Sequence, residues 1–95
     1  MSERTVIAEV SVPAFPRGVR LKHDEARSQW VILAPERMFV LDDIALAIMR
    51  RIDGETEVSV IVNELAEAFQ AARELILGDV LQMLQDFADK GVIKA

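Results

Sequence analysis

The sequence predicts an α+β domain in which a three-stranded antiparallel sheet is followed by a bundle of three helices. Three observations lead to this fold class. Short extended runs separated by turn-forming or charged residues fill residues 19–41, and the apolar period then changes to that of helices. The length of 95 residues limits the chain to one modest hydrophobic core. We therefore expect the helices to pack on one face of the sheet.

Residues 1–16 precede this pattern and are expected to form a flexible arm or linker. A short alternating stretch is followed by Pro13 and Pro16. Proline has no backbone N–H and favours extended geometry in the residue before it. The segment could connect domains or offer a strand to a partner, and residues 17–95 form the domain itself.

The strands are predicted at residues 19–23, 28–33 and 37–41. Polar residues turn the chain after the first strand, and the fixed φ of Pro35 sets the second turn. Because both connections are short, neighbouring strands should pair antiparallel.

Apolar residues with helical spacing predict three helices after Leu41. They are expected at residues 43–53, 58–68 and 73–90. Asp42 or Asp43 can cap the first helix, and Gly54 and Gly91 provide stops for the first and third. Three strands with these helices form a winged-helix-like domain, an architecture that does not by itself distinguish DNA binding from protein binding.

Composition and charge restrict the function. The formal net charge is −5, and acidic residues outnumber basic ones from residue 57 onward, so the helical half would repel a phosphate backbone. No apolar run is long enough to span a membrane, no secretion signal opens the sequence and cysteine is absent. We expect a cytoplasmic protein that binds neither nucleic acid nor membrane.

The sequence contains no pattern of catalytic residues. His23 is the single histidine, and no phosphate-binding loop, nucleophile elbow or metal-ligand spacing accompanies it. The pairs Asp42–Asp43 and Asp86/Asp89 are explained by helix capping and solvated helix faces. We expect no enzyme activity, no cofactor and no metal.

The third predicted strand has features of a binding edge. Exposed edge strands are usually guarded by charge or proline. Arg20 and Lys22 guard the first strand, whereas the third strand ends in the run Met38-Phe39-Val40-Leu41, which is apolar on both faces. This strand could accept an incoming strand, or the helices or the N-terminal arm could cover it.

The third helix carries two apolar ridges. One contains Ile76, Val80, Met83 and Phe87, and the other contains Leu77, Leu81, Leu84 and Ala88. One ridge should fill the core, and part of the other could line a groove beside the third strand. The alternative is that the helix is central and buried on both ridges.

A series of short elements occurs in a fixed order across residues 17–93. Its members are Gly18-Val19-Arg20-Leu21, Pro35-Glu36, Leu41-Asp42, Ala45 with Ile48, Asp53-Gly54, Val58 with Ile61-Val62 and Leu65, Asp79-Val80 with Leu84, and Gly91. Together these elements resemble the PqqD family, the peptide chaperones of pyrroloquinoline quinone (PQQ) biosynthesis. Glu57 departs from the family pattern because a Ser or Thr cap is common there, and Val60 stands where a polar residue is usual.

The resemblance implies a recognition element for a ribosomally synthesised precursor peptide. Such a domain would bind the precursor PqqA and present it to the radical S-adenosylmethionine enzyme PqqE. Some family members are fused to the pathway oxidase PqqC, so this chain could be fused to or associated with that oxidase. In relatives of this fold, the leader peptide adds as a strand to the third strand and packs against the third helix. The implied peptide-binding residues are Arg37, Met38, Phe39, Val40, Leu41, Ile76, Leu77, Val80, Leu81 and Leu84.

Two other functions remain open at this point. A DNA-binding winged helix is favoured by the helix order and opposed by the acidic third helix. A structural oligomerisation module would pair the third strand with its own copy and leave no peptide site.

Overall fold

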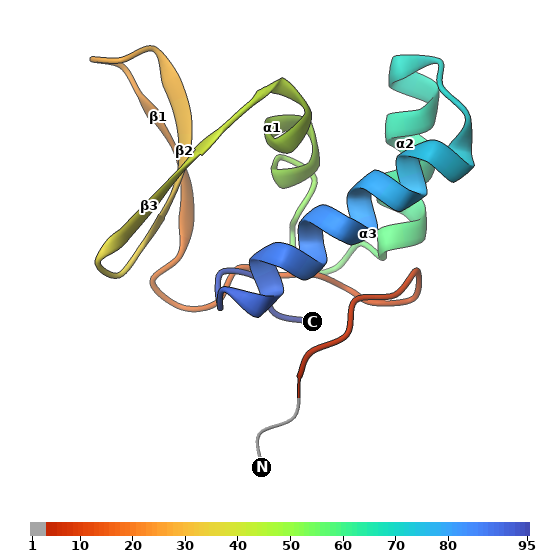
Figure 1. The fold of residues 1–95 in the computed structure, drawn as a ribbon, viewed down its shortest axis with the longest axis horizontal. Coiled ribbons are helices and arrows are strands. Elements are labelled where there is room, and N and C mark those ends of the chain that lie inside the picture. The colour runs from red at the N-terminus through yellow and green to blue at the C-terminus, as the bar shows by residue number, and fades with distance from the viewer. Residues whose placement is uncertain (1–3) are drawn as a thin grey trace.

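The computed structural model describes residues 4–95 and has the predicted α+β architecture (Figure 1). A three-stranded sheet precedes three helices. In chain order the elements are β1 (Arg20–Asp24), β2 (Gln29–Ala34), β3 (Arg37–Leu41), α1 (Asp43–Met49), α2 (Val58–Phe69) and α3 (Arg73–Asp89). The fold-class prediction is confirmed.

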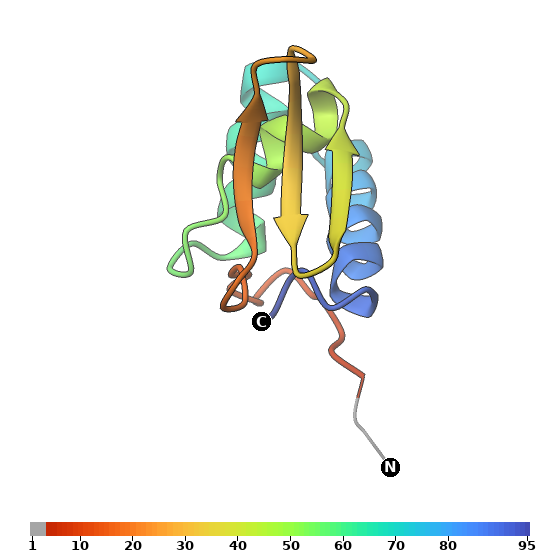
Figure 2. The same ribbon diagram turned by 90° about the vertical axis from the view of Figure 1, so that its left-hand side faces the viewer.

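The sheet is a simple antiparallel meander with strand order β1-β2-β3. β2 is central, and β1 and β3 are the two edges. A two-residue turn at Pro35 and Glu36 brings Ala34 opposite Arg37. The helices all lie behind one face of the sheet, as Figure 2 shows, so β3 is the edge beside α3.

Two predicted boundaries differ from the structure for reasons visible in the backbone. Ser28 was expected in β2, but its φ of +52° is left-handed and places it in the turn. The helix expected over residues 43–53 ends at Met49, because the backbone then continues through tighter bonds between residues three apart. The N–H groups of Arg51 and Ile52 donate to the carbonyls of Ile48 and Met49 at 3.1 and 3.2 Å, which tightens the chain after the helix.

The core lies between the inner face of the sheet and the three helices. Its residues with 1% exposure or less include Ile32 from β2, Ile48 and Met49 from α1, and Leu84 from α3. The C-terminal Val92 and Ile93 are also buried and belong to the same cluster. No polar side chain is buried within residues 4–95. Packing of apolar side chains therefore holds the sheet and helices together.

Residues 4–16, predicted to form an arm or linker, lie along α2 and α3 in this structure. Ile7 is buried in the core cluster, and Ala14 pairs with Lys94 through two backbone bonds of 2.8 and 2.9 Å. The carbonyls of Ser11 and Glu9 accept the first N–H groups of α2, each at 2.9 Å. This segment satisfies amide groups that the α2 N-terminus would otherwise leave to water.

Candidate functional site

An open groove lies between β3 and α3. Its volume is about 840 Å³. The start of α1 closes it at the end of β3, and α3 forms its opposite wall. Its lining residues are Val40, Leu41, Asp42, Ile44, Ala45, Asp79, Gln82, Met83, Gln85, Asp86, Phe87 and Asp89.

The outer edge of β3 carries backbone groups that are available for pairing. In an antiparallel pair, alternate residues exchange both backbone bonds. Arg37 lies opposite Ala34 across the tight turn, so its backbone groups point toward β2. By alternation, the N–H and C=O groups of Met38 and Val40 point away from β2. Among residues 4–95, no strand pairs with this edge. The N-terminal arm, which could have covered it, runs along α2 and α3.

The groove has an apolar floor and an acidic rim. Leu41, Ala45 and Phe87 are buried at its base. Val40 is 56% exposed and Ile44 is 54% exposed, so both leave apolar surface at the groove open to a partner. The exposed carboxylates that line the groove are Asp42, Asp79, Asp86 and Asp89. The site therefore suits an extended, partly apolar chain that carries basic side chains.

One end of the groove is held by contacts between β3 and the end of α3. The Arg37 Nη1 donates to the Lys90 carbonyl at 2.7 Å, so the first residue of β3 binds the C-terminal cap of α3. Phe39 meets Phe87 edge to face, with ring centroids 5.7 Å apart, and the Lys90 ammonium lies 5.8 Å from each ring. These contacts set the spacing between β3 and α3.

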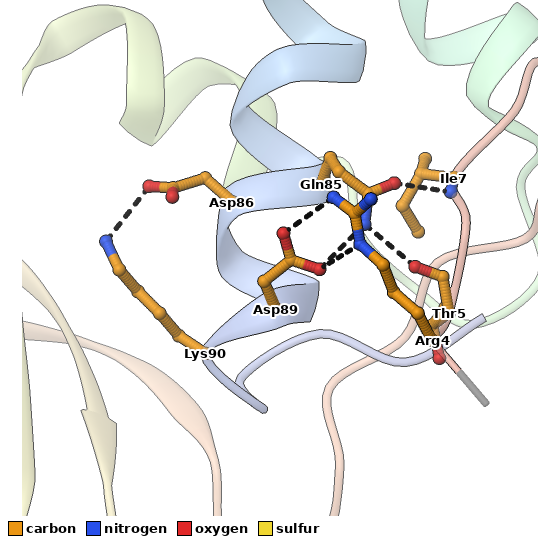
Figure 3. Close-up of polar contacts among 7 residues, drawn as sticks. All are labelled: Arg4, Thr5, Ile7, Gln85, Asp86, Asp89 and Lys90. Carbon is orange, nitrogen blue, oxygen red and sulfur yellow. Dashed lines mark hydrogen bonds and ion pairs between the residues drawn. The ribbon is translucent and has the colours of Figure 1, made fainter. Parts of the chain in front are cut away.

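The N-terminal arm is attached to the groove wall on α3 (Figure 3). Arg4 donates two bonds of 2.9 Å to the two carboxylate oxygens of Asp89. The Gln85 side chain accepts from the Ile7 N–H at 2.9 Å and donates to the Thr5 carbonyl at 2.8 Å. The hydrogen bond from Arg4, aided by one from Gln85, lowers the pKa of Asp89 below its ordinary value. Asp89 is already paired with a guanidinium in the free protein.

The five β3 residues predicted to bind peptide occupy three different environments. Val40 and Leu41 line the groove. Met38 is exposed on the outer face of the sheet, and Phe39 is half-buried against Phe87. Arg37 extends to the end of α3 instead of into the groove.

The five α3 residues predicted to bind peptide do not line this groove. Val80 and Leu84 are buried in the core, and Leu77 and Leu81 are half-buried against it. Ile76 and Val80 line an adjoining hollow near α2. Both predicted ridges therefore contribute to the core, while Met83 and Phe87 of the first ridge also line the groove.

The residues of α3 that do line the groove form a neighbouring stripe. Asp79, Gln82, Met83 and Asp86 follow helical spacing. Of these, Asp86 was expected on a solvated face and Met83 in the first apolar ridge. Met83, an apolar residue within this polar stripe, is the signal that could have identified it.

The histidine and aspartates considered as candidate catalytic or metal-binding groups have other environments in the structure. His23 is exposed on β1 with its ring 4.9 Å from that of Trp30. Asp42 caps α1 by accepting from the Ala45 N–H at 2.8 Å. No group of three His, Asp or Glu residues suited to a metal ion occurs in the described part of the chain. None of the helices there is long and apolar enough to cross a bilayer.

The chain is similar to proteins of PQQ biosynthesis. Residues 29–93 match the family model described as Coenzyme PQQ synthesis protein D (PqqD). A PqqA binding protein of Rhodopseudomonas palustris (strain BisB5) is 48% identical over 92 residues, covering 97% of this chain and 90% of that protein. A bifunctional coenzyme PQQ synthesis protein C/D of Methylorubrum extorquens is 43% identical over 93 residues, covering 98% of this chain and 25% of that protein.

Two solved structures have the same fold. The solution structure of the PqqD truncation of Methylobacterium extorquens PqqCD has a TM-score of 0.84 and 42% identity, covering 99% of this chain and 100% of that one. It is described as a functional and stand-alone recognition element for ribosomally synthesized and post-translationally modified peptides. A crystal structure of PqqD from Xanthomonas campestris has a TM-score of 0.60 and 43% identity, covering 94% of this chain and 99% of that one.

Proposed function

The chain belongs to the PqqD family, and on that basis we propose that it binds a PqqA precursor peptide during PQQ biosynthesis. The peptide adds as a fourth strand to the free edge of β3 and packs its side chains into the groove beside α3. The observation that carries this proposal is the edge of β3, which pairs with no strand among residues 4–95 and lies next to a groove of about 840 Å³. This mode of recognition is strand addition, in which backbone bonds and side-chain pockets act together.

Both parts of the site are needed for useful affinity. Each backbone hydrogen bond contributes only about 0.5–1.5 kcal/mol, whereas association costs about 4–15 kcal/mol. The outward backbone groups of Met38 and Val40 cannot offset that cost alone. Burial of apolar surface adds roughly 25 cal/mol per Å², and Val40, Ile44 and Met83 offer such surface in the groove.

The role that follows is that of a carrier and not of a catalyst. We infer that the domain holds PqqA for the radical S-adenosylmethionine enzyme PqqE, in the cytoplasm, and performs no chemical step itself. The names of the relatives, which describe binding proteins, support the non-catalytic role. The bifunctional C/D relative supports a working association with PqqC.

A titration of the ¹⁵N-labelled protein with the PqqA peptide of Rhodopseudomonas palustris tests this assignment. We expect the largest amide shifts along β3 and on the stripe of α3 that includes Asp79, Met83 and Asp86. Shifts confined to loops, or to residues outside the groove, would contradict it.

Replacing Val40 with proline tests the backbone part of the site. Proline removes a donor from the free edge without removing a bond to β2, so we expect at least a tenfold loss of peptide affinity in a folded protein. His23→Pro is the matched control, because the same alternation directs the His23 N–H to the opposite edge of the sheet. Equal affinity of both variants, with folding verified by circular dichroism, would refute strand addition at β3.

A further inference from the structure

A second, smaller hollow continues the groove beyond the end of β3. Its volume is about 230 Å³, and α1, α2 and α3 all contribute to its wall. We call it the end hollow and define it by Ile44, Phe69, Ile76 and Asp79 at its mouth. Ile44 and Asp79 line both the end hollow and the groove, so a chain lying in one can extend into the other.

The end hollow is apolar and open to solvent. Ile48, Leu65 and Val80 are buried at its base. Phe69 at its mouth is 51% exposed, and Ile44 is 54% exposed. Apolar surface on this scale, continuous with a binding groove, is typical of a place where a partner side chain is buried.

The size of the end hollow matches one large side chain. An apolar cavity of about 150 Å³ lined by leucine, isoleucine and phenylalanine is large enough to hold a benzene ring. At about 230 Å³, the end hollow can take an aromatic ring or a branched aliphatic side chain. It is too small to enclose a helix, so its occupant is a single side chain.

Asp79 lies where the groove meets the end hollow, and its carboxylate favours a positively charged side chain there. Asp86 is paired with Lys90 and Asp89 with Arg4, both at 2.9 Å, and Asp42 caps α1. Asp79 has no ion-pair or hydrogen-bond partner among residues 4–95, and its side chain is exposed. It is the groove carboxylate that is available to a basic side chain of the incoming peptide.

We propose that the peptide held along β3 places a large apolar side chain in the end hollow and a nearby lysine or arginine against Asp79. This inference rests on the proposed function and deepens it, because it states which peptides the site selects. The strand-paired segment supplies affinity for any extended chain with apolar side chains. The apolar side chain in the end hollow and the basic side chain at Asp79, both beyond the end of β3, determine which of these chains is selected.

Three variants test the proposal by fluorescence anisotropy with fluorescein-labelled PqqA of Rhodopseudomonas palustris. We expect Phe69→Ala to weaken binding about tenfold, as loss of a buried anchor contact does. We expect Asp79→Asn to weaken it about threefold at low salt and less at about 0.5 M salt, because an exposed ion pair is screened. Leu75→Ala is the control, since Leu75 is 69% exposed but lines neither space, and should bind like the unchanged protein.

An alanine scan of the peptide against each variant identifies the contacts. Alanine at one apolar peptide position should weaken binding to the unchanged protein but not to the Phe69→Ala variant. Alanine at a nearby basic position should likewise have no effect on binding to the Asp79→Asn variant, because the effects of contacting residues are not additive. If Val40→Pro abolishes binding while Phe69→Ala and Asp79→Asn do not change it, this proposal fails and the proposed function stands. If the unchanged protein does not bind PqqA, the proposed function fails. If Phe69→Ala alters only self-association in sedimentation, the end hollow holds a second copy and the proposal is wrong.

Discussion

At the scale of single residues, Asp53 organises the connection between α1 and α2. Its side chain accepts from the N–H groups of Glu55 and Thr56 at 2.9 and 2.8 Å, and from the Thr56 hydroxyl at 2.8 Å. These bonds, with that of the Glu55 amide the largest, lower the pKa of Asp53 below its ordinary value of 3.8. An ionised Asp53 therefore stabilises the bend at Gly54, where φ is +77°.

The lowered pKa of Asp53 predicts a pH dependence. As pH falls, the unfolded chain binds a proton at Asp53 before the folded protein does, so this contribution is present above about pH 5 and is lost below the folded pKa. We expect Asp53→Asn to lower the urea midpoint at pH 7, and the difference from the unchanged protein to shrink toward pH 3. Glu55→Gln is the control and should show no such convergence. A constant difference across this range would show that charge at Asp53 is unimportant.

Helix caps are predictable from the sequence when the capping residue is next to the helix, and unpredictable when it is remote. Asp42 and Asp43 were the two predicted candidates for the cap of α1, and Asp42 is the one that caps it; the prediction was possible because a capping side chain lies next to the helix it caps. Glu57 offers no side-chain cap to α2, yet α2 begins at Val58 as predicted. The carbonyls of Ser11 and Glu9 bind its first N–H groups instead. Such a cap from a remote segment leaves no local signal in the sequence.

Among the elements, α3 helps to hold the N-terminal arm through the side chain of Gln85. Gln85 binds the Ile7 N–H and the Thr5 carbonyl, and it lines the groove as well (Figure 3). We expect Gln85→Ala to lower the free energy of unfolding by about 0.5–2 kcal/mol and to speed hydrogen exchange at the Ile7 amide. Chemical denaturation and exchange monitored by NMR measure the two effects.

Gln82→Ala provides the matched control for this arm prediction. Gln82 also lies on α3 and lines the groove, but its side chain makes no hydrogen bond within residues 4–95. The control should leave both stability and Ile7 exchange unchanged. Equal effects of the two substitutions would mean that general changes to α3, and not the arm contact, explain the result.

The helices themselves were predictable, whereas the face of α3 that borders the groove was not. Helical period identified residues 73–90 and both apolar ridges. It could not say that Val80 and Leu84 fill the core while Met83 faces the groove, because that depends on where β3 lies. The position of β3 relative to α3 is fixed by long-range contacts such as that of Arg37 with the Lys90 carbonyl.

In the molecule as a whole, the layer arrangement explains why the proposed site lies at β3. The helices cover one face of the sheet, and α3 runs beside the β3 edge without pairing with it (Figures 1 and 2). The net charge of −5 and the acidic groove rim disfavour nucleic acid and favour a peptide with basic side chains. Strand order and layers follow from short connections, but the width of the groove results from packing of the complete domain.

Occupation of this groove should stabilise the whole domain. A ligand that binds only the folded state at about one hundred times its Kd adds roughly 2.7 kcal/mol to the free energy of unfolding. For a domain of 95 residues, this corresponds to a rise in Tm of roughly 10–20 °C. We therefore expect PqqA to raise the midpoint in differential scanning calorimetry, and the rise to grow with the logarithm of peptide concentration.

Two controls distinguish peptide recognition from a general effect of added polymer. A scrambled PqqA peptide should give a much smaller shift, since the order of its side chains no longer fits the groove. A DNA duplex at low salt should give none because the helical half is acidic. The Val40→Pro protein should unfold near the midpoint of the unchanged free protein with or without PqqA. A shift of the midpoint that DNA causes and salt removes would instead favour a DNA-binding function. Binding of phosphates releases counterions, whereas strand addition does not.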